Sequence, residues 1–557
     1  MTNYEIADQL SFLSKLMDLH GENSFRAKSY SIAAFYLEKF EVEVADMEDT
    51  VLFSQKGIGE SMGRHIRELQ TTGKLQALEE ILARTPQGLL EIMQIKGLGP
   101  KKVAVIWKEM GIESVGELEY ACNENRLVTY KGFSAKTQEA VLQNIQFIRN
   151  NAGFHLWAEV QDIANTLVNG LGRVNPGKLF ALAGAYRRQM PTLECIDIVT
   201  DAPIAVLRQQ FGVTPNAQIE EKDGLLQIHA PNQPKIVVHT VTAEEYYKTL
   251  FVTSASDEFL NAFNTQYKIP DSIKSEEDIF TANKLPYIHP AQRETAGILQ
   301  QAVANNLPQL IQPSDIKSII HCHSNWSDGM NTIADMAKAA IDKGYEYLVL
   351  SDHSQSAYYA NGLTPERIAK QHAEVDALNA KLAPFKIFKS IESDILGDGN
   401  LDYTPEVLKT FDLVIASVHS NLKMTQEKAM DRVLTAIRNP YTTILGHPTG
   451  RLLLSREGYP LDHRVIIEEC VKHNVVIEIN AHPRRLDLDW AWIEYALEKG
   501  ALLSIDPDAH VIDGYDDVYY GVMAAQKGGL TTKHNLSSFG LADFERFLQQ
   551  QKIKHTL

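Results

Sequence analysis

The stretch SIIHCHSNWSDG, residues 318–329, decides the fold of the C-terminal part of this chain. A short apolar strand runs into two histidines separated by one residue, and an aspartate follows a few residues later. Six further apolar runs downstream also end in a histidine or a carboxylate: YLVLSDHS, IFKSIESDIL, LVIASVHS, TTILGHPTG, VVIEINAHP and LLSIDPDAH. Helical patterns separate these runs, and strands that alternate with helices are typical of repeated βα units and a parallel, barrel-like sheet.

The polar residues at these strand ends form a candidate metal site. The carboxyl ends of parallel strands converge on one face, so residues distant in sequence can meet there. One histidine at a strand end would more often be structural, but repetition at seven strand ends favours ligands. Strand residues two apart share a face, so His321 and His323 can hold one metal while Cys322 points away. The candidate ligands are His321, His323, Asp328, His353, Glu392, His419, His447, Asp508 and His510.

The types of these residues limit the choice of metal. Imidazole mixed with carboxylate suits zinc, manganese or iron better than calcium or magnesium alone. The lack of thiolates among the candidate ligands argues against a structural zinc site. A water between two such ions loses its proton near neutral pH, and the resulting hydroxide can attack phosphorus. The site is therefore interpreted as a metal-dependent phosphoesterase.

The motifs resemble those of the polymerase and histidinol phosphatase (PHP) family: HxH with a downstream SDG, then SDHS, ESDILGDG, SVHS, GHPTGR and DAH. All nine positions that carry the trinuclear cluster of that family are filled. The resemblance implies three divalent ions, manganese or zinc, with iron as a further candidate. It places the first ion on His321, His323, Glu392 and Asp508, the second on Glu392, Asp328 and His510, and the third on His353, His419 and His447.

Two arginines near these motifs are candidates for contact with a substrate phosphate, which a guanidinium can bind bidentately. Arg451 in GHPTGR is the predicted catalytic arginine, and Arg485 in NAHPRRLDL is a second candidate. For each of them, a structural ion pair with Asp487 or Asp489 is the alternative.

Glycine turns between helical segments recur in the first 150 residues. Glycine permits a positive φ and lets a phosphate approach the N–H groups at the start of the next helix. The turns resemble helix-hairpin-helix DNA-binding motifs, although a third copy at Gly132 has Ser134 in place of the second glycine. The DNA-binding candidates are Lys56, Gly57, Gly59, Lys96, Gly97, Gly99, Lys101 and Lys102. The alternative is that these glycines only end helices.

Residues 179–200, LFALAGAYRRQMPTLECIDIVT, resemble the nucleotidyltransferase signature of family X DNA polymerases. The vestigial nucleotide-binding residues are Gly184, Arg187, Arg188 and Asp197. Cys195 stands where the family has its first metal-binding aspartate, and residues 237–239 lack the third. Two-metal phosphoryl transfer needs carboxylates that bridge the ions, so we expect an inactive polymerase palm. Asp201 and Asp223 are the alternatives if the alignment register is different.

The resemblance to bacterial family X polymerases extends over the whole chain. It predicts a multidomain protein with all-α N-terminal helix-hairpin-helix domains, an α+β nucleotidyltransferase-like palm and thumb, and a C-terminal α/β PHP barrel of parallel strands. The expected domains are a small lyase-like DNA-binding domain (1–80), helix-hairpin-helix fingers (81–150), a degenerate palm (151–242), a thumb with linker (243–315) and the PHP domain (316–557).

Composition limits the partners and the compartment. The 557 residues carry a net charge of −17, which argues against coating nucleic acid over the whole surface. Residues 51–150 escape this acidity, with 13 Lys and Arg against 11 Asp and Glu. No stretch is apolar enough for a membrane span, the start lacks a signal peptide, and the four cysteines are scattered. We expect a cytoplasmic protein, monomer favoured, without a membrane partner.

The leading functional hypothesis is a DNA repair nuclease that removes nucleotides from a 3′ end of gapped or nicked DNA. Action at abasic sites or on 3′ phosphates is an extension of it. One alternative keeps gap-filling polymerase activity, for which Mg²⁺ would be the cofactor. A second alternative is a small-molecule phosphatase of the histidinol phosphatase type, and a third is a non-catalytic DNA adaptor.

Overall fold

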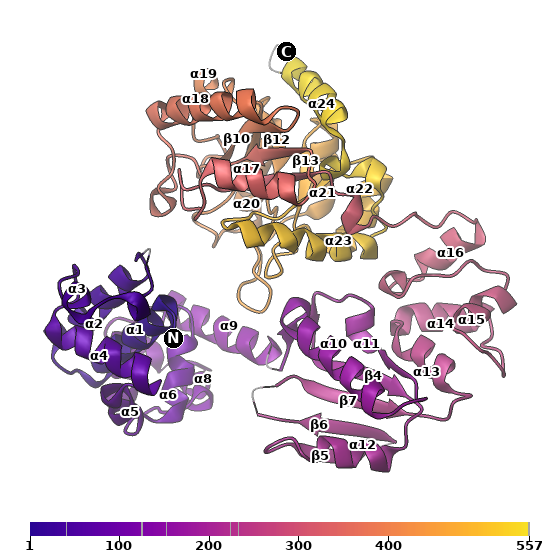
Figure 1. Ribbon diagram of the computed structural model, residues 1–557, viewed down its shortest axis with the longest axis horizontal. Coiled ribbons are helices and arrows are strands. Elements are labelled where there is room, and N and C mark those ends of the chain that lie inside the picture. Colours follow the sequence, from indigo (N-terminus) through magenta and orange to yellow (C-terminus); the bar gives the residue numbers. More distant parts are fainter. Residues whose placement is uncertain (41, 124–125, 152, 223, 232, 555–557) are drawn as a thin grey trace. The chain divides into compact units, whose positions relative to one another are not determined.

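The computed structural model describes residues 1–40, 42–123, 126–151, 153–222, 224–231 and 233–554. The chain forms two compact units, residues 1–152 and 153–557 (Figure 1). The predicted fold class is confirmed: a helical N-terminal unit, a mixed α/β middle and a C-terminal barrel of parallel strands. The finer division into five domains stays a prediction.

The first unit is entirely helical in its described residues. Its first helix begins at a capping box in which Thr2 and Glu5 satisfy each other's backbone N–H groups, and it ends at Gly21 with φ 74°. Leucine and isoleucine side chains from successive helices fill one shared core. The helices are α1 Asn3–His20, α2 Ser24–Leu37, α3 Asp49–Phe53, α4 Glu60–Thr72, α5 Gln76–Leu82, α6 Gln87–Gln94, α7 Pro100–Lys108, α8 Val115–Asn123 and α9 Ala135–Asn151.

Three glycine turns of one geometry precede α4, α7 and α9. In each, the glycine has a positive φ and the next apolar residue is buried. The φ values are 83° at Gly57, 91° at Gly97 and 96° at Gly132. The third turn matches the first two although Ser134 replaces glycine, because its Oγ accepts a hydrogen bond from the Thr137 N–H (3.2 Å). The serine therefore supplies a cap for α9.

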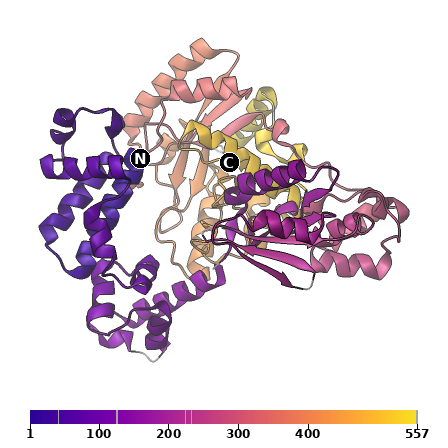
Figure 2. The ribbon, with the colours of Figure 1, turned by 60° about the horizontal axis from the view of Figure 1, so that its bottom comes forward.

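The middle of the chain forms a five-stranded sheet of order β2-β4-β7-β6-β5, in which only β4 and β7 are parallel. Its core packs against α10, and the sheet is easily followed in Figure 2. The elements are β1 His155–Leu156, α10 Trp157–Val174, β2 Phe180–Leu182, α11 Gly184–Arg187, β3 Thr192–Leu193, β4 Cys195–Thr200, α12 Ile204–Phe211, β5 Gln218–Lys222, β6 Leu225–His229 and β7 Lys235–Thr240.

A helical segment follows, with phenylalanines at its core. Arg293 is fully buried there, with its guanidinium 5.2 Å from the ring centroid of Phe251 and 5.1 Å from that of Phe280. The helices are α13 Tyr246–Thr253, α14 Asp257–Gln266, α15 Glu277–Ala282 and α16 Gly297–Val303.

Seven parallel strands, β8 to β14 in chain order, form a nearly closed barrel. The gap between β8 and β14 is bridged beyond the strand ends, where the His323 N–H donates to the Ala509 carbonyl (2.8 Å). Every residue of β8 is buried, as expected for a strand covered on both faces. The strands are β8 Ser318–Cys322, β9 Tyr347–Leu350, β10 Lys386–Asp394, β11 Leu413–Ser417, β12 Thr442–Leu445, β13 Val476–Asn480 and β14 Leu503–Asp506.

Helices surround this barrel. They are α17 Ile333–Asp342, α18 Pro365–Leu382, α19 Pro405–Leu408, α20 Gln426–Arg438, α21 His463–Lys472, α22 Ile493–Glu498, α23 Val518–Lys527 and α24 Leu541–Ile553. Within the described residues, none of the helices is both long and apolar enough to cross a membrane.

Candidate metal centre

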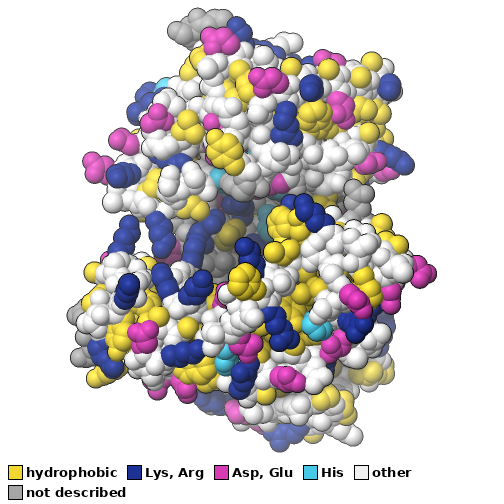
Figure 3. Space-filling view, turned by 90° about the vertical axis from the view of Figure 1, so that its left-hand side faces the viewer, with side chains coloured by type: hydrophobic (Ala, Val, Ile, Leu, Met, Phe, Trp, Pro, Cys, Tyr) yellow, Lys and Arg dark blue, Asp and Glu magenta, His cyan; other side chains and the backbone are white. Residues whose placement is uncertain are grey.

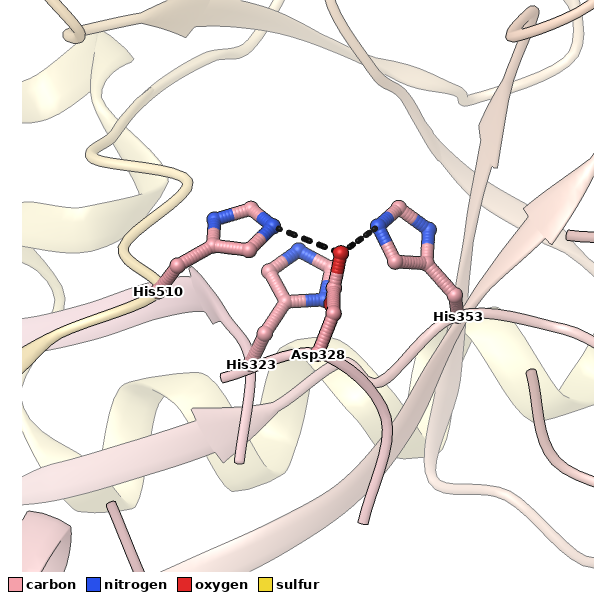
Figure 4. Close-up of side chains that lie close together, drawn as sticks. All are labelled: His323, Asp328, His353 and His510. Atoms are coloured by element: carbon pink, nitrogen blue, oxygen red, sulfur yellow. Dashed lines mark ion pairs between the residues drawn. The ribbon is translucent and has the colours of Figure 1, made fainter. Parts of the chain in front are cut away.

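The barrel brings the nine predicted ligands to one end of its strands. Three groups of side chains have ligand atoms within 4.8 Å of one another. The first is His323, Asp328, His353 and His510, the second His321, His323, Glu392 and Asp508, and the third His353, Glu392 and His419. Figure 4 shows the first group, in which Asp328 Oδ2 lies 3.6 Å from His510 Nε2 and 3.7 Å from His353 Nε2.

These groups can be compared with the ion assignments that the PHP resemblance implies. The second group is the set predicted for the first ion. Asp328 and His510 meet His323 and His353 instead of Glu392. His447 lies outside the three groups, but its Nε2 is 3.0 Å from Glu392 Oε1. Glu392 is therefore the central carboxylate of the site.

The burial of the ligand atoms fits metal ions. His321, His323, Glu392 and His447 are at most 1% exposed. Yet His323 Nδ1 and His447 Nδ1 find no hydrogen-bond partner among the described residues, while His321 Nε2 and Glu392 Oε2 contact other candidate ligands, Glu392 Oε1 (3.3 Å) and His353 Nδ1 (2.9 Å). Orphaned polar atoms are rare in protein interiors. Imidazole nitrogens and carboxylate oxygens are ligands for divalent zinc, manganese or iron, so the residues fit such ions.

The pKa shifts of these residues also favour metal binding. Burial lowers the pKa of His323 to about 3, helped by the neighbouring His353 and His510, so its imidazole is neutral and can coordinate. Burial alone would raise the pKa of Glu392, but the surrounding histidines, His419 first, hold it well below its usual range. The central carboxylate is therefore ionised.

Three predicted ligands have an unusual backbone. His321, His447 and Asp508 have φ of 60°, 23° and 53°, in the left-handed region that non-glycine residues seldom adopt. Strand pairing shifts register between Ile319 and Cys322. The regular alternation of side chains along a strand therefore does not explain the directions of His321 and His323. Their rings still converge, with centroids 5.3 Å apart. Such strain is concentrated at functional sites.

Sequence reasoning missed the carboxylates behind the ligands. Glu478 Oε1 lies 2.5 Å from His321 Nδ1, and Asp394 Oδ1 lies 2.5 Å from His419 Nδ1. Each carboxylate holds the far nitrogen of its histidine, so that Nε2 faces the ligand groups. The signal was a second polar residue in the strand: E-x-D ends β10, and E-x-N ends β13.

A third missed carboxylate, Asp352, supports the loop that carries Asp328. It accepts hydrogen bonds from Ser324 N and Oγ, Ser327 Oγ and Gln371 Nε2, at 2.5–2.8 Å. Asp352 is fully buried. It therefore fixes the path of the loop between His323 and Asp328.

The two candidate arginines differ in their surroundings. Arg451 donates Nε to the Arg485 carbonyl (2.9 Å), and its terminal nitrogens contact the Asp489 carboxylate and the Leu486 carbonyl. This geometry is that of the structural alternative. Arg485 Nε instead lies 3.6 Å from Oδ2 of the candidate ligand Asp508. Arg485 is therefore the arginine that faces the site.

The palm residues also have partners within the protein. Asp197 Oδ1 lies 2.9 Å from His239 Nε2, and its Oδ2 accepts from Cys195 Sγ at 3.4 Å. Gly184 is required beside it, because a Cβ there would lie 2.0 Å from Asp197 Oδ2. Of the alternative carboxylates, Asp201 caps the Leu179 N–H (2.7 Å), and Asp223 lies outside the described residues.

The two palm arginines form ion pairs across to the helical segment that follows. Arg187 binds Glu276 through both terminal nitrogens (3.0 and 2.6 Å), and Arg188 Nε binds Glu294 (3.0 Å). Glu276 also pairs with the buried Arg293 at 2.5 Å. These contacts satisfy the guanidinium groups that the sequence assigns to nucleotide phosphates.

The hairpin residues lie at the surface of the first unit. Lys56, Lys96 and Lys101 are exposed, and Lys102 is half-buried, with its Nζ on the Gly97 carbonyl (3.1 Å). The four hairpin glycines, Gly57, Gly59, Gly97 and Gly99, are exposed. Figure 3 shows Lys and Arg side chains exposed at the surface.

Comparison with known proteins decides the family. The helix-hairpin-helix domain family matches residues 1–75, and the PHP domain family matches residues 320–482. The DNA polymerase/3′-5′ exonuclease PolX of Bacillus subtilis (strain 168) is 35% identical over 99% of this chain and all of its own length. The chain belongs to the PolX family of DNA polymerase/3′-5′ exonucleases. Its barrel is thus the PHP domain of a PolX-family enzyme.

Shorter relatives match less than half of this chain. A probable phosphatase of Thermoanaerobacter sp. (strain X514) is 25% identical over 42% of this chain and 95% of its own length. A probable phosphatase of Acetivibrio thermocellus is 26% identical over 36% of this chain and 83% of its own length.

Proposed function

We propose that this PolX-family protein is a metal-dependent 3′-5′ exonuclease acting on DNA ends in repair. The observation that carries the proposal is the set of imidazole and carboxylate atoms that converge at one end of the barrel, some of them buried without hydrogen-bond partners among the described residues. The Bacillus subtilis relative is named a 3′-5′ exonuclease, and the three lysine-flanked hairpin turns suit contact with a DNA backbone.

The nine candidate ligands would hold three divalent ions, manganese or zinc first. Such ions supply a hydroxide at neutral pH and neutralise charge on the phosphate. The protein's own contribution is orientation: Glu478 and Asp394 direct His321 and His419, and Arg485 contacts a non-bridging phosphate oxygen. Asp328 and His510, with side chains 32% and 39% exposed, form the rim where DNA enters.

We further infer that polymerase activity is lost. Within the described residues, the two oxygens of Asp197 contact a thiol, Cys195, and an imidazole, His239, whereas two-metal chemistry needs a second carboxylate to share the ions. Arg187 and Arg188 are engaged with Glu276 and Glu294. The alternative is a bifunctional enzyme that also fills gaps with Mg²⁺.

One experiment tests both statements. The purified protein is incubated with a 5′-labelled primer-template and Mn²⁺, with and without dNTPs, beside His419→Ala. Shortening of the primer without extension is expected, and the substitution should abolish it. Extension with dNTPs would overturn the loss of polymerase activity. Degradation that persists in His419→Ala would overturn the assignment of the site.

The phosphatase relatives favour a second candidate, a phosphomonoesterase acting on small molecules or on 3′ phosphates. Histidinol phosphate, a 3′-phosphorylated oligonucleotide and an abasic duplex offered in parallel distinguish these substrates. Release of phosphate from histidinol phosphate without any cleavage of DNA would establish the small-molecule alternative.

A further inference from the structure

We propose that the palm of this protein positions the residue that contacts the substrate phosphate in the PHP domain. The contact runs through residues 482–487, called here the substrate loop, which follows β13 and carries Arg485. The palm would then be a working part of the hydrolytic site. This inference rests on the proposed function only where Arg485 contacts phosphate.

One side of the substrate loop is fixed to the metal centre. The Asn480 N–H donates to the Asp487 carbonyl (2.6 Å), and Asn480 Nδ2 donates to Asp508 Oδ2 (3.1 Å). The buried Asp487 carboxylate accepts from Thr449 N and Oγ1, both at 2.9 Å. The end of the loop near Asp487 is therefore tied to the candidate ligands.

The other side of the loop packs on the palm. Pro483 and Leu486 face Trp157, Met190 and Pro191 across a cavity of only 10 Å³. That volume is about the least that can hold one water molecule, so no large gap separates the two surfaces. Leu486 is 6% exposed and Trp157 is 7% exposed. A change of side-chain volume at this surface of the palm should therefore shift the loop.

The palm residues that face the loop are held in place by contacts within the palm. Trp157 Nε1 donates to the Tyr186 carbonyl (2.9 Å), and its N–H donates to the Pro191 carbonyl (3.0 Å). The Trp157 ring stacks on Tyr186, with centroids 4.7 Å apart. Because Trp157 is fixed in this way, it can hold the residues of the loop that pack against it in one position.

An ion pair joins the same two surfaces next to Arg485. Glu159 Oε1 of α10 lies 3.1 Å from Arg484 Nη2. Both side chains are about half exposed, so this pair alone contributes little stability. The role of this ion pair is to position the chain, because it holds Arg484, the residue directly before Arg485.

Position matters at Arg485 because its guanidinium contacts Asp508 only at long range. The ion pair with Asp508 is long, at 3.6 Å. The backbone of the loop must therefore place it. A misplacement of about 1 Å near a reacting group can lower a rate by about 100-fold.

The test uses palm variants that touch no candidate ligand: Met190→Ala, with Met190→Leu as the volume-conserving control, and Glu159→Ala. Glu221→Ala is the matched control, since it breaks an equally exposed palm ion pair, with Arg208 (3.4 Å), away from the loop. The measurements are kcat/KM on a single-stranded oligonucleotide, bound metal, and hydrogen exchange of the peptide covering 482–487.

Met190→Ala should lower kcat/KM by about threefold to tenfold, less than a full 1 Å misplacement would cause. Glu159→Ala should act in the same direction, and the charge swap Glu159→Arg with Arg484→Glu should restore the rate. Bound metal should be unchanged, and exchange of the loop should rise in both variants. Met190→Leu and Glu221→Ala should behave as the wild type.

The decisive comparison is made in an Arg485→Ala background. If the palm acts through Arg485, Met190→Ala should have no further effect there. An equal fall in both backgrounds, or unchanged loop exchange in Met190→Ala, would overturn the inference. Failure of the proposed function is a different result: the wild type would not cleave DNA, while loop exchange would still report whether the palm positions the loop.

Discussion

Replacing Glu478 by alanine removes the group that orients His321. Glu478 is fully buried, and both of its oxygens are used. Oε1 binds His321 Nδ1 at 2.5 Å, and Oε2 accepts from the His447 backbone N–H and from Asn480 Nδ2 (3.3 Å). One carboxylate therefore supports two candidate ligands. Its loss frees the His321 ring to rotate and to adopt the other tautomer.

The expected magnitude follows from this geometry. Loss of an orienting partner behind a ligand typically weakens metal binding by about 10- to 100-fold. That range corresponds to about 1.4–2.7 kcal/mol of binding free energy. Because Glu478 also holds the backbone of His447, the effect should lie near the upper end. Glu478→Gln keeps one acceptor for His321 and should weaken binding less.

The assay is a metal titration of the metal-free protein against a chelator of known affinity, with bound Mn²⁺ or Zn²⁺ measured by mass spectrometry. Glu374→Gln is the control, since Glu374 binds Trp326 Nε1 (2.9 Å) and no candidate ligand. Thermal unfolding of the metal-free variants reports any general loss of fold. Metal affinity within twofold of the wild type in a folded Glu478→Ala protein would refute the orienting role.

Three further outcomes are expected. Burial alone would raise the pKa of Glu276, but the ion pairs of Glu276 with Arg187 and Arg293 lower that pKa. The ionised carboxylate therefore contributes stability above pH ~4.5, and this contribution is lost as pH falls through the pKa of the folded state. In urea, Glu276→Gln should lower the unfolding free energy by about 3–5 kcal/mol at pH 7, and the difference from the wild type should shrink in acid; a constant difference would contradict this. Arg451→Ala should lower the unfolding free energy by about 1–3 kcal/mol, measured the same way, since two backbone carbonyls lose their donor; full stability with lost activity would restore its catalytic role. Lys56→Ala should reduce the salt dependence of DNA binding, measured by fluorescence anisotropy, by about one unit of slope, and an unchanged slope would exclude a phosphate contact.

The parallel barrel could be predicted because its strands are buried on both faces. Such strands read as continuous apolar runs, and the chemistry stands directly after each run. His353 after β9 and His419 after β11 are examples, and in the structure both lie beside Glu392. Predicting which residues lie at the strand ends required no knowledge of side-chain packing. The architecture itself brings them together.

The choice between Arg451 and Arg485 could not be made from the sequence. Both follow strand ends, and both have aspartates nearby. The outcome depends on the path of the substrate loop, whose carbonyls at Arg485 and Leu486 turn toward Arg451. That path includes a positive φ of 42° at Leu486, which no local pattern indicates. Glu478 was missed for a related reason, since its role depends on which nitrogen of His321 it holds.

The palm is where sequence and structure complement each other. The resemblance to family X polymerases predicts that Cys195 stands at the position of an aspartate, and the structure shows that His239 and Cys195 contact the oxygens of Asp197. A carboxylate left alone by its lost partners would carry an uncompensated, partly buried charge, which is unfavourable. The hydrogen bond with the histidine gives this carboxylate a polar partner without a metal. The arginine pairs act likewise, because Arg187 and Glu276 neutralise each other. A palm held by these contacts faces the substrate loop of the PHP domain through Trp157 and Met190, which is the arrangement that the positioning role proposed above requires.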